Sequence, residues 1–160
     1  MSPVWASAIA VLGTLLGSGL TYTFQRLTLN RTVTETRSEK RREEFANAVV
    51  AYASAATALR RAEFDRAKKR LERAVDPDRE EARQETYRLR AEAQRAYYLL
   101  RLLANPDTDA DLVRDAVNVI ERLRLITAGS TSLEQVRARS NDATEALDKV
   151  VDRANRRLRS

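Results

Sequence analysis

The residues best suited to bind a ligand in this 160-residue sequence are basic, and many of them fall between residues 60 and 73. This basic cluster consists of Arg60, Arg61, Arg66, Lys68, Lys69, Arg70 and Arg73. Dense positive charge is what nucleic-acid phosphates require, so the cluster is a candidate nucleic-acid site. The competing interpretation is a solvated helix face, which is the more usual role of a charge run.

A second basic group follows an uncharged N-terminal stretch that reaches Gln25. The group follows the predicted membrane span at residues 4–24, and we call it the juxtamembrane group. It consists of Arg26, Arg31, Arg37, Lys40, Arg41 and Arg42. Two acidic residues, Glu35 and Glu39, lie among them, which leaves a net charge of +4 (six minus two). Near an anionic leaflet each basic side chain contributes about 1 kcal/mol of attraction. We therefore expect lipid headgroups to be the partners of this group.

The composition argues against an enzyme. The sequence has no Cys and no His, so it lacks a thiol nucleophile, the commonest metal ligand and the usual general base. The acidic run at residues 107–111 resembles the start of a calcium loop, but Leu112 and Asn118 stand where such a loop needs Gly and a carboxylate. We interpret this run as the start of a helix and predict neither a metal nor a cofactor.

Residues 4–24 are predicted to form a single transmembrane helix. A helix of that length spans roughly 31 Å, about the thickness of a bilayer core. Trp5 and Tyr22 lie near its two ends, where interfacial aromatic residues are expected. Two alternatives stay open, a buried helix of a soluble domain and a cleaved signal peptide. The second would need a basic segment before the apolar stretch, and only Met1, Ser2 and Pro3 precede it.

The residues around this span predict its orientation and its self-association. All nearby Lys and Arg follow it, so the N-terminus is expected outside the cell membrane and the rest of the chain in the cytoplasm. On a helical wheel Ala10, Gly13 and Gly17 share one face, whereas Leu12 and Leu16 lie on the other. The step from Gly13 to Gly17 is a GxxxG motif, which favours a homo-oligomer through close helix packing in lipid.

The remaining sequence predicts an all-α fold. Apolar residues recur at helical spacing in four segments that begin near residues 45, 76, 108 and 131. The last three of these segments begin with capping signals. These are Asp76 followed by Pro77 at the second segment, Thr108 at the third, and Thr131 with Glu134 at the fourth. Their short connections favour an antiparallel bundle of about four helices, with an extended coiled coil as the alternative. The tyrosines Tyr52, Tyr87 and Tyr97 fall on or near the apolar seams and are predicted to be core residues.

These segments divide the chain into a transmembrane anchor at 1–25, a basic juxtamembrane stalk at 26–44 and a helical bundle domain at 45–160. The sequence has an uncharged span, VWASAIAVLGTLLGSGLTYTFQ, followed by an Arg/Thr-rich stretch and then by an Ala/Arg-rich helical domain. This order of segments resembles the KilB-like small membrane proteins of actinomycetes and their plasmids. The resemblance covers mainly residues 4–40. It implies a membrane-bound, non-enzymatic role associated with intermycelial plasmid spread, and it assigns no functional residue.

The sequence predicts two alternative functions. The first is a single-pass membrane protein with a structural or protein-interaction role in plasmid spread or a related membrane process, whose partners are the bilayer, copies of itself or a cytoplasmic protein. The alternative is a membrane-tethered nucleic-acid-binding protein that uses the basic cluster of the first cytoplasmic helix.

Overall fold

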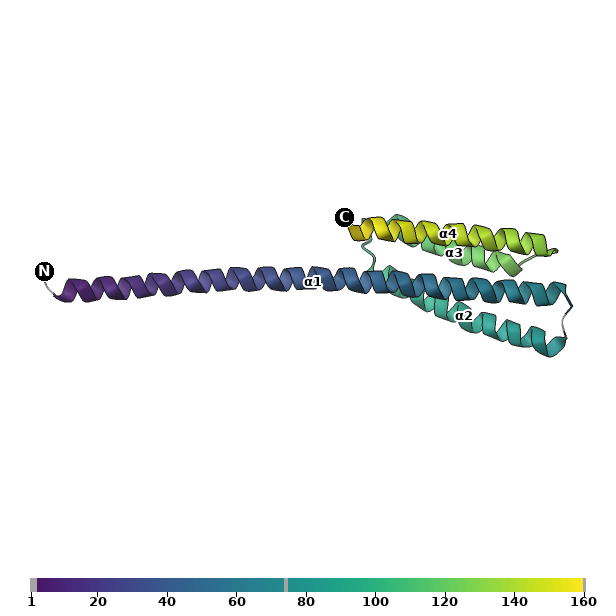
Figure 1. Cartoon of the computed structure of the whole chain (residues 1–160), viewed down its shortest axis with the longest axis horizontal. Helices are drawn as coiled ribbons and strands as arrows, with labels where there is room; N and C mark the ends of the chain where they lie inside the picture. Colours follow the sequence, from purple (N-terminus) through teal and green to yellow (C-terminus); the bar gives the residue numbers. More distant parts are fainter. Residues whose placement is uncertain (1–2, 74, 160) are drawn as a thin grey trace. The chain divides into compact units, whose positions relative to one another are not determined.

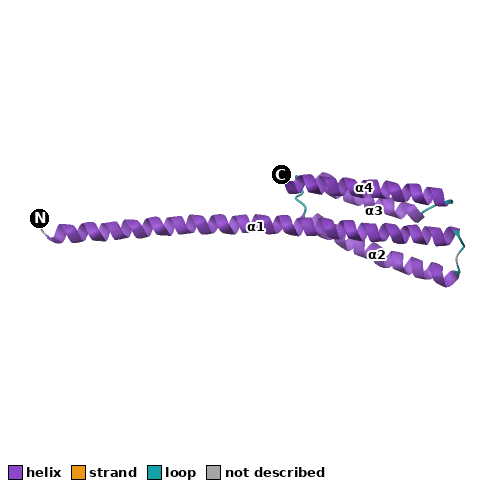
Figure 2. Cartoon of the chain, in the orientation of Figure 1, coloured by secondary structure: helices purple, strands orange, loops and turns teal. Residues whose placement is uncertain are grey.

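The computed structural model describes the backbone of residues 3–73 and 75–159, and the side chains of residues 37–73 and 75–159. Four helices make up this part of the chain, and it contains no strand (Figures 1 and 2). They are α1 (Pro3–Leu71), α2 (Asp76–Leu103), α3 (Ala110–Thr127) and α4 (Leu133–Arg159). The chain divides into two units, residues 1–41 and residues 42–160.

Within the second unit, the C-terminal part of α1 and the other three helices pack side by side as an antiparallel bundle (Figure 1). One end of the bundle holds Phe45, the α2–α3 connection and the end of α4, since Arg157 lies 5.2 Å from the Phe45 ring. The other end holds the α1–α2 and α3–α4 connections, since Arg70 donates a 2.6 Å hydrogen bond to the Ser130 carbonyl. Four helices around one core confirm the predicted bundle, and the extended coiled coil is not supported.

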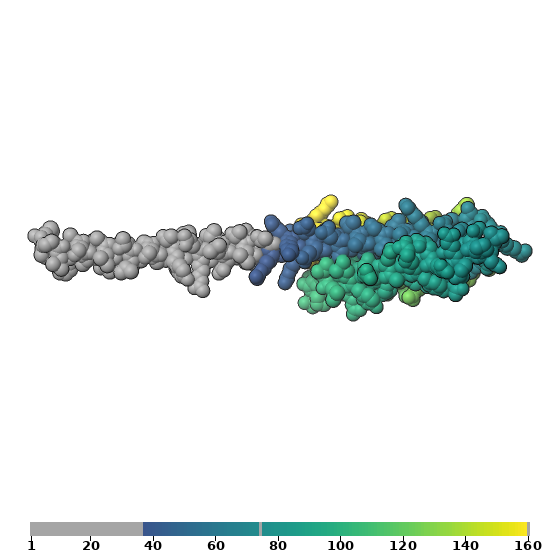
Figure 3. Space-filling view, turned by 90° about the horizontal axis from the view of Figure 1, so that it is seen from below, coloured from purple at the N-terminus to yellow at the C-terminus, as the bar shows by residue number. Residues whose placement is uncertain are grey.

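The core of the bundle is lined largely by small and aliphatic side chains from all four helices. Its buried alanines are Ala48, Ala56, Ala67, Ala93, Ala116, Ala143, Ala146 and Ala154. Small side chains at the contacts let neighbouring helices approach closely, because interaxial distance depends on the residues between them. In the space-filling view, side chains of α2 cover much of the face of the bundle that is seen (Figure 3).

Tyr52 connects two helices through the centre of this core. Its side chain is fully buried, and its hydroxyl donates a 2.6 Å hydrogen bond to the backbone carbonyl of Ala116 on α3. Burial is the main cause that raises the pKa of the Tyr52 phenol above its ordinary range. Tyr97 is buried as well, so the predicted core position of these two tyrosines is confirmed.

The helix starts lie where the sequence predicts them, but the capping residues differ by one position. Helix α2 has Val75 as its N-cap, and Pro77 lies in the first turn as expected. The N-cap of α3 is Asp109, without a capping side-chain bond. Before α4, the Ser132 hydroxyl accepts a 3.3 Å bond from the Gln135 N–H, whereas Gln135 Oε1 accepts a 3.0 Å bond from the Thr131 N–H. The capping group is therefore Ser132 with Gln135, one residue beyond the predicted pair.

Candidate functional site: an arginine-lined cavity

The residues of the predicted basic cluster make different contacts in the structure. Arg60 donates a 2.8 Å bond to the hydroxyl of Ser140 on α4, so it helps to hold that helix. Lys68 is exposed and lies 3.9 Å from Glu72, and Lys69 donates a 3.4 Å bond to the Asp78 carbonyl. Arg61 and Arg73 are exposed, and Arg73 adopts a left-handed backbone conformation (φ 53°) just after α1 ends. The seven residues therefore differ in their contacts and in their exposure.

Two members of the cluster, Arg66 and Arg70, instead line a cavity of about 380 Å³ together with residues of α2 and α3. Among the residues that the structure describes, the lining consists of Arg66, Arg70, Asp76, Arg79, Glu80, Arg83 and Thr127. The reversal of the chain between the end of α1 and the start of α2 brings the i, i+4 pair Arg66 and Arg70 against a second pair from the first turns of α2. This second pair, Arg79 and Arg83, is not among the residues predicted from the sequence.

The cavity carries excess positive charge. Four arginines and two carboxylates line it, which gives a formal charge of +2 (four minus two). The carboxylate of Asp76 lies 3.7 Å from Arg79, and that of Glu80 lies 3.6 Å from Arg83. Both separations exceed ordinary hydrogen-bond length, so these are loose, solvent-exposed pairs worth at most about 1 kcal/mol each.

Tyr87 lies beside this cavity under three guanidinium groups. Arg66, Arg83 and Arg90 lie 5.6, 5.6 and 5.8 Å from the centre of its ring, within the range of cation–π contacts. Arg83 also donates a 3.3 Å hydrogen bond to the Tyr87 hydroxyl. That bond is the main cause that lowers the pKa of Tyr87, and the charge of Arg83 adds to it.

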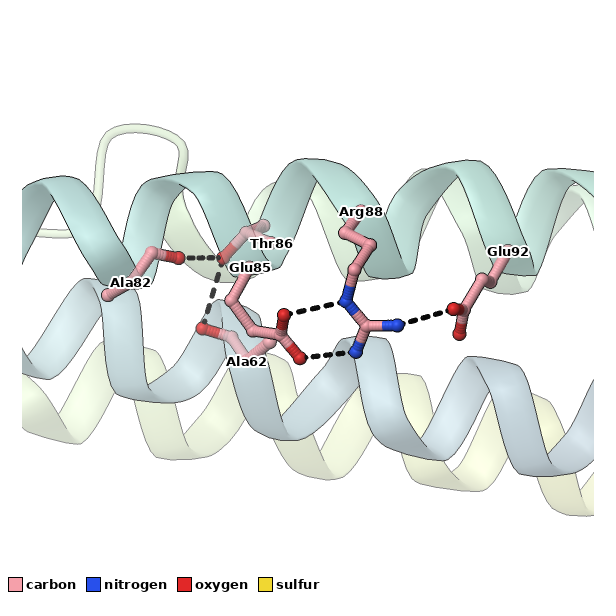
Figure 4. A network of polar contacts seen from close by, with 6 residues as sticks. All are labelled: Ala62, Ala82, Glu85, Thr86, Arg88 and Glu92. Carbon is pink, nitrogen blue, oxygen red and sulfur yellow. Dashed lines mark hydrogen bonds and ion pairs between the residues drawn. The ribbon is translucent and has the colours of Figure 1, made fainter.

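The prediction that Tyr87 is a core residue is wrong, because 47% of the residue is exposed. The seam of α2 passes through Thr86 and Leu89, and Tyr87 is one position, or about 100°, away from Thr86. Thr86 donates to the Ala82 carbonyl at 2.7 Å and lies 3.4 Å from the Ala62 carbonyl of α1 (Figure 4).

The exposed side of α2 near Thr86 carries a different kind of arginine contact. Arg88 lies between Glu85 and Glu92 and bonds to both carboxylates, at distances of 2.5 to 2.8 Å (Figure 4). Its hydrogen bond is the main cause that lowers the pKa of Glu85. Arg88 is thus neutralised on both sides, unlike the arginines of the cavity.

An ion pair between a buried glutamate and a half-buried arginine lies next to the cavity. Glu63 of α1 is fully buried and pairs with Arg90 of α2. The Thr127 hydroxyl donates to the Glu63 carboxylate at 2.5 Å and to the Glu63 backbone carbonyl at 3.1 Å. The negative charge of Glu63 is therefore compensated locally and does not cancel the excess charge of the cavity lining.

The acidic run 107–111 lies at the opposite end of the bundle, and two of its carboxylates, those of Asp109 and Asp111, form ion pairs. Asp109 is buried, and its carboxylate lies 3.0 Å from Arg157 of α4 and accepts a 2.8 Å bond from the Asn105 N–H. Asp111 pairs with Arg114 and, at 3.2 Å, with Arg153. The run thus attaches the α2–α3 connection to α4.

The predicted lipid-contacting residues are described only in part. Arg37, Lys40, Arg41 and Arg42 are exposed. The side chains of Arg26 and Arg31, and those of the span residues Trp5, Gly13, Gly17 and Tyr22, lie outside the described set. A search of the described residues for a helix long and apolar enough to cross a membrane finds none.

Comparison with known proteins assigns the bundle to a family. Residues 46–158 match the family described as KilB plasmid transfer protein. The matched region is the helical bundle, whereas the resemblance noted in the sequence lies mainly at residues 4–40. No curated protein and no solved structure matches the chain. Because the match covers more than half of the 160 residues, the chain belongs to the KilB plasmid transfer protein family.

Proposed function

We propose that this chain is a single-pass membrane protein that serves plasmid transfer as a structural or protein-interaction component, with its helical bundle in the cytoplasm. The observation that carries the proposal is the family match, which covers the bundle almost from its first buried residue, Phe45, to the end of α4. A role in a plasmid-related process is what that family description supports for this chain.

The membrane part of the proposal is supported by the sequence of the first 42 residues. A stretch of 21 uncharged residues, 4–24, has the length of a membrane-spanning helix. The Lys and Arg residues of the juxtamembrane group all follow it, which favours a cytoplasmic bundle by the positive-inside rule.

The non-enzymatic part is supported by residue chemistry. Without Cys or His, the chain has no thiol or imidazole for nucleophilic or acid–base catalysis. Four of its carboxylates form ion pairs with Arg88, Arg157 and Arg153, namely those of Glu85, Glu92, Asp109 and Asp111. Carboxylates held in such ion pairs stabilise the bundle, which supports a structural role.

The alternative function, nucleic-acid binding through the basic cluster, stays a prediction. Arg60 and Arg70 bond to groups within the bundle, which lowers the number of basic side chains available to phosphates. Replacing Arg61, Lys68 and Lys69 with Gln is its direct test. The nucleic-acid hypothesis is rejected if the variant binds duplex DNA at low salt as well as the parent protein does. It is also rejected if the parent protein does not bind DNA.

Plasmid transfer frequency between cells tests the main proposal. Leu15→Arg together with Leu16→Arg places two charges at the centre of the predicted span, at a cost of about 2.5–3.5 kcal/mol each. We expect transfer to fall to the level of a strain without the protein. Leu15→Ile with Leu16→Ile is the matched control and should retain transfer. Full transfer by the arginine variant would contradict an essential membrane anchor.

A further inference from the structure

We propose that the arginine-lined cavity between α1 and α2 is a binding site for the phosphoryl group of a small ligand, in the size class of a free nucleotide or pyrophosphate. This goes beyond the proposed function, because it assigns a ligand to the bundle and does not depend on the membrane anchor.

The lining of the cavity has the chemistry that a phosphate group requires. A guanidinium group presents a planar fork of N–H donors that matches two oxygens of a phosphate. Four such groups, from Arg66, Arg70, Arg79 and Arg83, line one cavity of about 380 Å³. They come from two helices that meet at a tight reversal, so the fold and not local sequence alone brings them together.

These four arginines also retain binding capacity for a ligand. Within the described part of the chain, no carboxylate lies at ion-pair distance from Arg66 or Arg70. Arg70 uses one terminal nitrogen for the Ser130 carbonyl at 2.6 Å. The pairs of Arg79 and Arg83 with Asp76 and Glu80, at 3.7 and 3.6 Å, are loose enough for a phosphate oxygen to compete with them.

The cavity is also partly preorganised. The ring of Tyr87 lies 5.6 Å from both Arg66 and Arg83, one from each helix, and its hydroxyl accepts a hydrogen bond from Arg83. Holding two like-charged side chains beside one ring reduces the freedom that they lose when an anion binds. Tyr87 is therefore a positioning residue for the site.

The size of the cavity favours a small ligand over a duplex. Small-molecule sites are usually concave and measure about 300–1,000 Å³, and this cavity is at the lower end of that range. A protein that binds duplex DNA instead spreads its phosphate contacts along a surface. Here the basic residues outside the cavity, such as Arg60 and Lys68, point into different surroundings.

The test measures binding of pyrophosphate and of ATP to the full-length protein in a non-ionic detergent, by calorimetry at low salt. The site variant combines Arg66→Gln with Arg83→Gln. The matched control combines Arg95→Gln with Arg101→Gln, two exposed arginines of α2 outside the cavity, so both variants lose two positive charges. Circular dichroism establishes that each variant is folded.

We expect the site variant to bind pyrophosphate about tenfold or more weakly than the parent, and the control to change by less than about twofold. Arg79→Gln alone, at a half-exposed position, should weaken binding in the same direction if the double variant fails to fold. Tyr87→Leu should weaken binding, and Tyr87→Phe should retain most of it, because the ring is the positioning element.

Three results would overturn the proposal. The first is an absence of pyrophosphate and ATP binding by the parent protein at millimolar concentration. The second is an equal loss in the site variant and the control, which would show a response to net charge alone. The third is tighter binding of duplex DNA than of both small ligands with the same dependence on Arg66 and Arg83, which would assign the cavity to nucleic acid.

Discussion

The carboxylate of Glu63, fully buried on α1, accepts a 2.5 Å hydrogen bond from the hydroxyl of Thr127 on α3. Arg90 of α2 pairs with the same carboxylate, so one acidic side chain connects three helices. The Nε atom of Arg90 is buried and has no hydrogen-bond partner among the described atoms. Arg90 is half-buried, whereas the carboxylate of Glu63 is fully buried and would be very costly to leave without its counter-ion.

Arg90→Met should therefore destabilise the bundle by about 3 kcal/mol, because it leaves the Glu63 charge buried without its counter-ion. Chemical denaturation of the full-length protein in detergent measures the change. Arg95→Met, at an exposed position of the same helix, should stay within about 0.5 kcal/mol. The double variant Glu63→Leu with Arg90→Met should recover most of the loss. An Arg90→Met variant as stable as the control would show that the pair is not buried as described.

Asp109 is the corresponding polar contact at the other end of the bundle. Asp109→Ala removes the acceptor for Arg157 and for the Asn105 N–H, so a loss of about 2 kcal/mol is expected. Asp107→Ala, at an exposed position in the same connection, is the control and should change stability little. Limited proteolysis gives a local readout, with faster cleavage near residues 104–110 in the Asp109 variant. Equal cleavage of the two variants would speak against this role of Asp109.

Tyr87 gives the arginine-lined cavity a signature that depends on pH. Because Arg83 lowers the pKa of Tyr87 below its ordinary value of 10, its phenolate should form at lower pH in the folded chain than in the unfolded chain. Between these two pKa values the unfolded state binds more protons, so this residue adds stability as pH rises through that window. The added stability is lost as pH falls through the folded pKa.

Ultraviolet absorbance of tyrosinate measures this titration. Tyr87→Phe should remove the earliest tyrosine transition, and Arg83→Gln should move it toward higher pH. Arg95→Gln has the same charge change and should leave the transition in place. An unaltered titration in Arg83→Gln would mean that the arginine does not contact the phenol in solution.

The predicted self-association of the span has a direct chemical test, because the sequence contains no native Cys. Ala10→Cys lies on the predicted face of small residues with Gly13 and Gly17, and Leu12→Cys lies on the opposite face. Under mild oxidation in membranes, the Ala10→Cys variant should form disulfide-linked dimers and the Leu12→Cys variant should not. Equal crosslinking of the two would reject a defined helix face.

Much of the bundle follows from the sequence because helix periodicity and turn residues are local signals. The apolar seams at spacings of three and four place Leu89, Ala93, Tyr97 and Leu100 correctly in the core. The helix starts near Asp76, Ala110 and Leu133 follow from nearby Pro, Asp, Ser and Thr residues. The exact cap is less certain from sequence, since neighbouring residues such as Thr131 and Ser132 have equivalent hydroxyl groups.

The arginine-lined cavity could not be predicted in the same way, because it depends on how two helices face each other. Arg66 and Arg70 belong to the basic cluster, whereas Arg79 and Arg83 lie in residues 76–160, where acidic and basic residues are equal in number. Only the reversal of the chain between α1 and α2 brings the two pairs together. The one available signal was their common i, i+4 spacing on either side of that reversal.

The buried position of Glu63 could not be predicted from the sequence either. A glutamate in a charged segment predicts a solvated position, yet this one is fully buried because residue 63 falls on the seam between Leu59 and Ala67. Its partners, Arg90 and Thr127, are distant in sequence, so the compensation that makes burial acceptable is visible only in the folded chain.

Membrane fractionation with a topology reporter on the full-length protein tests whether the chain has a membrane anchor and a cytoplasmic bundle. The protein should stay with the membrane after carbonate extraction, and a reporter fused after Ser160 should be on the cytoplasmic side and resist protease added to intact cells. A product that is soluble or shortened at its N-terminus, or a reporter on the outer side, would contradict the proposed function.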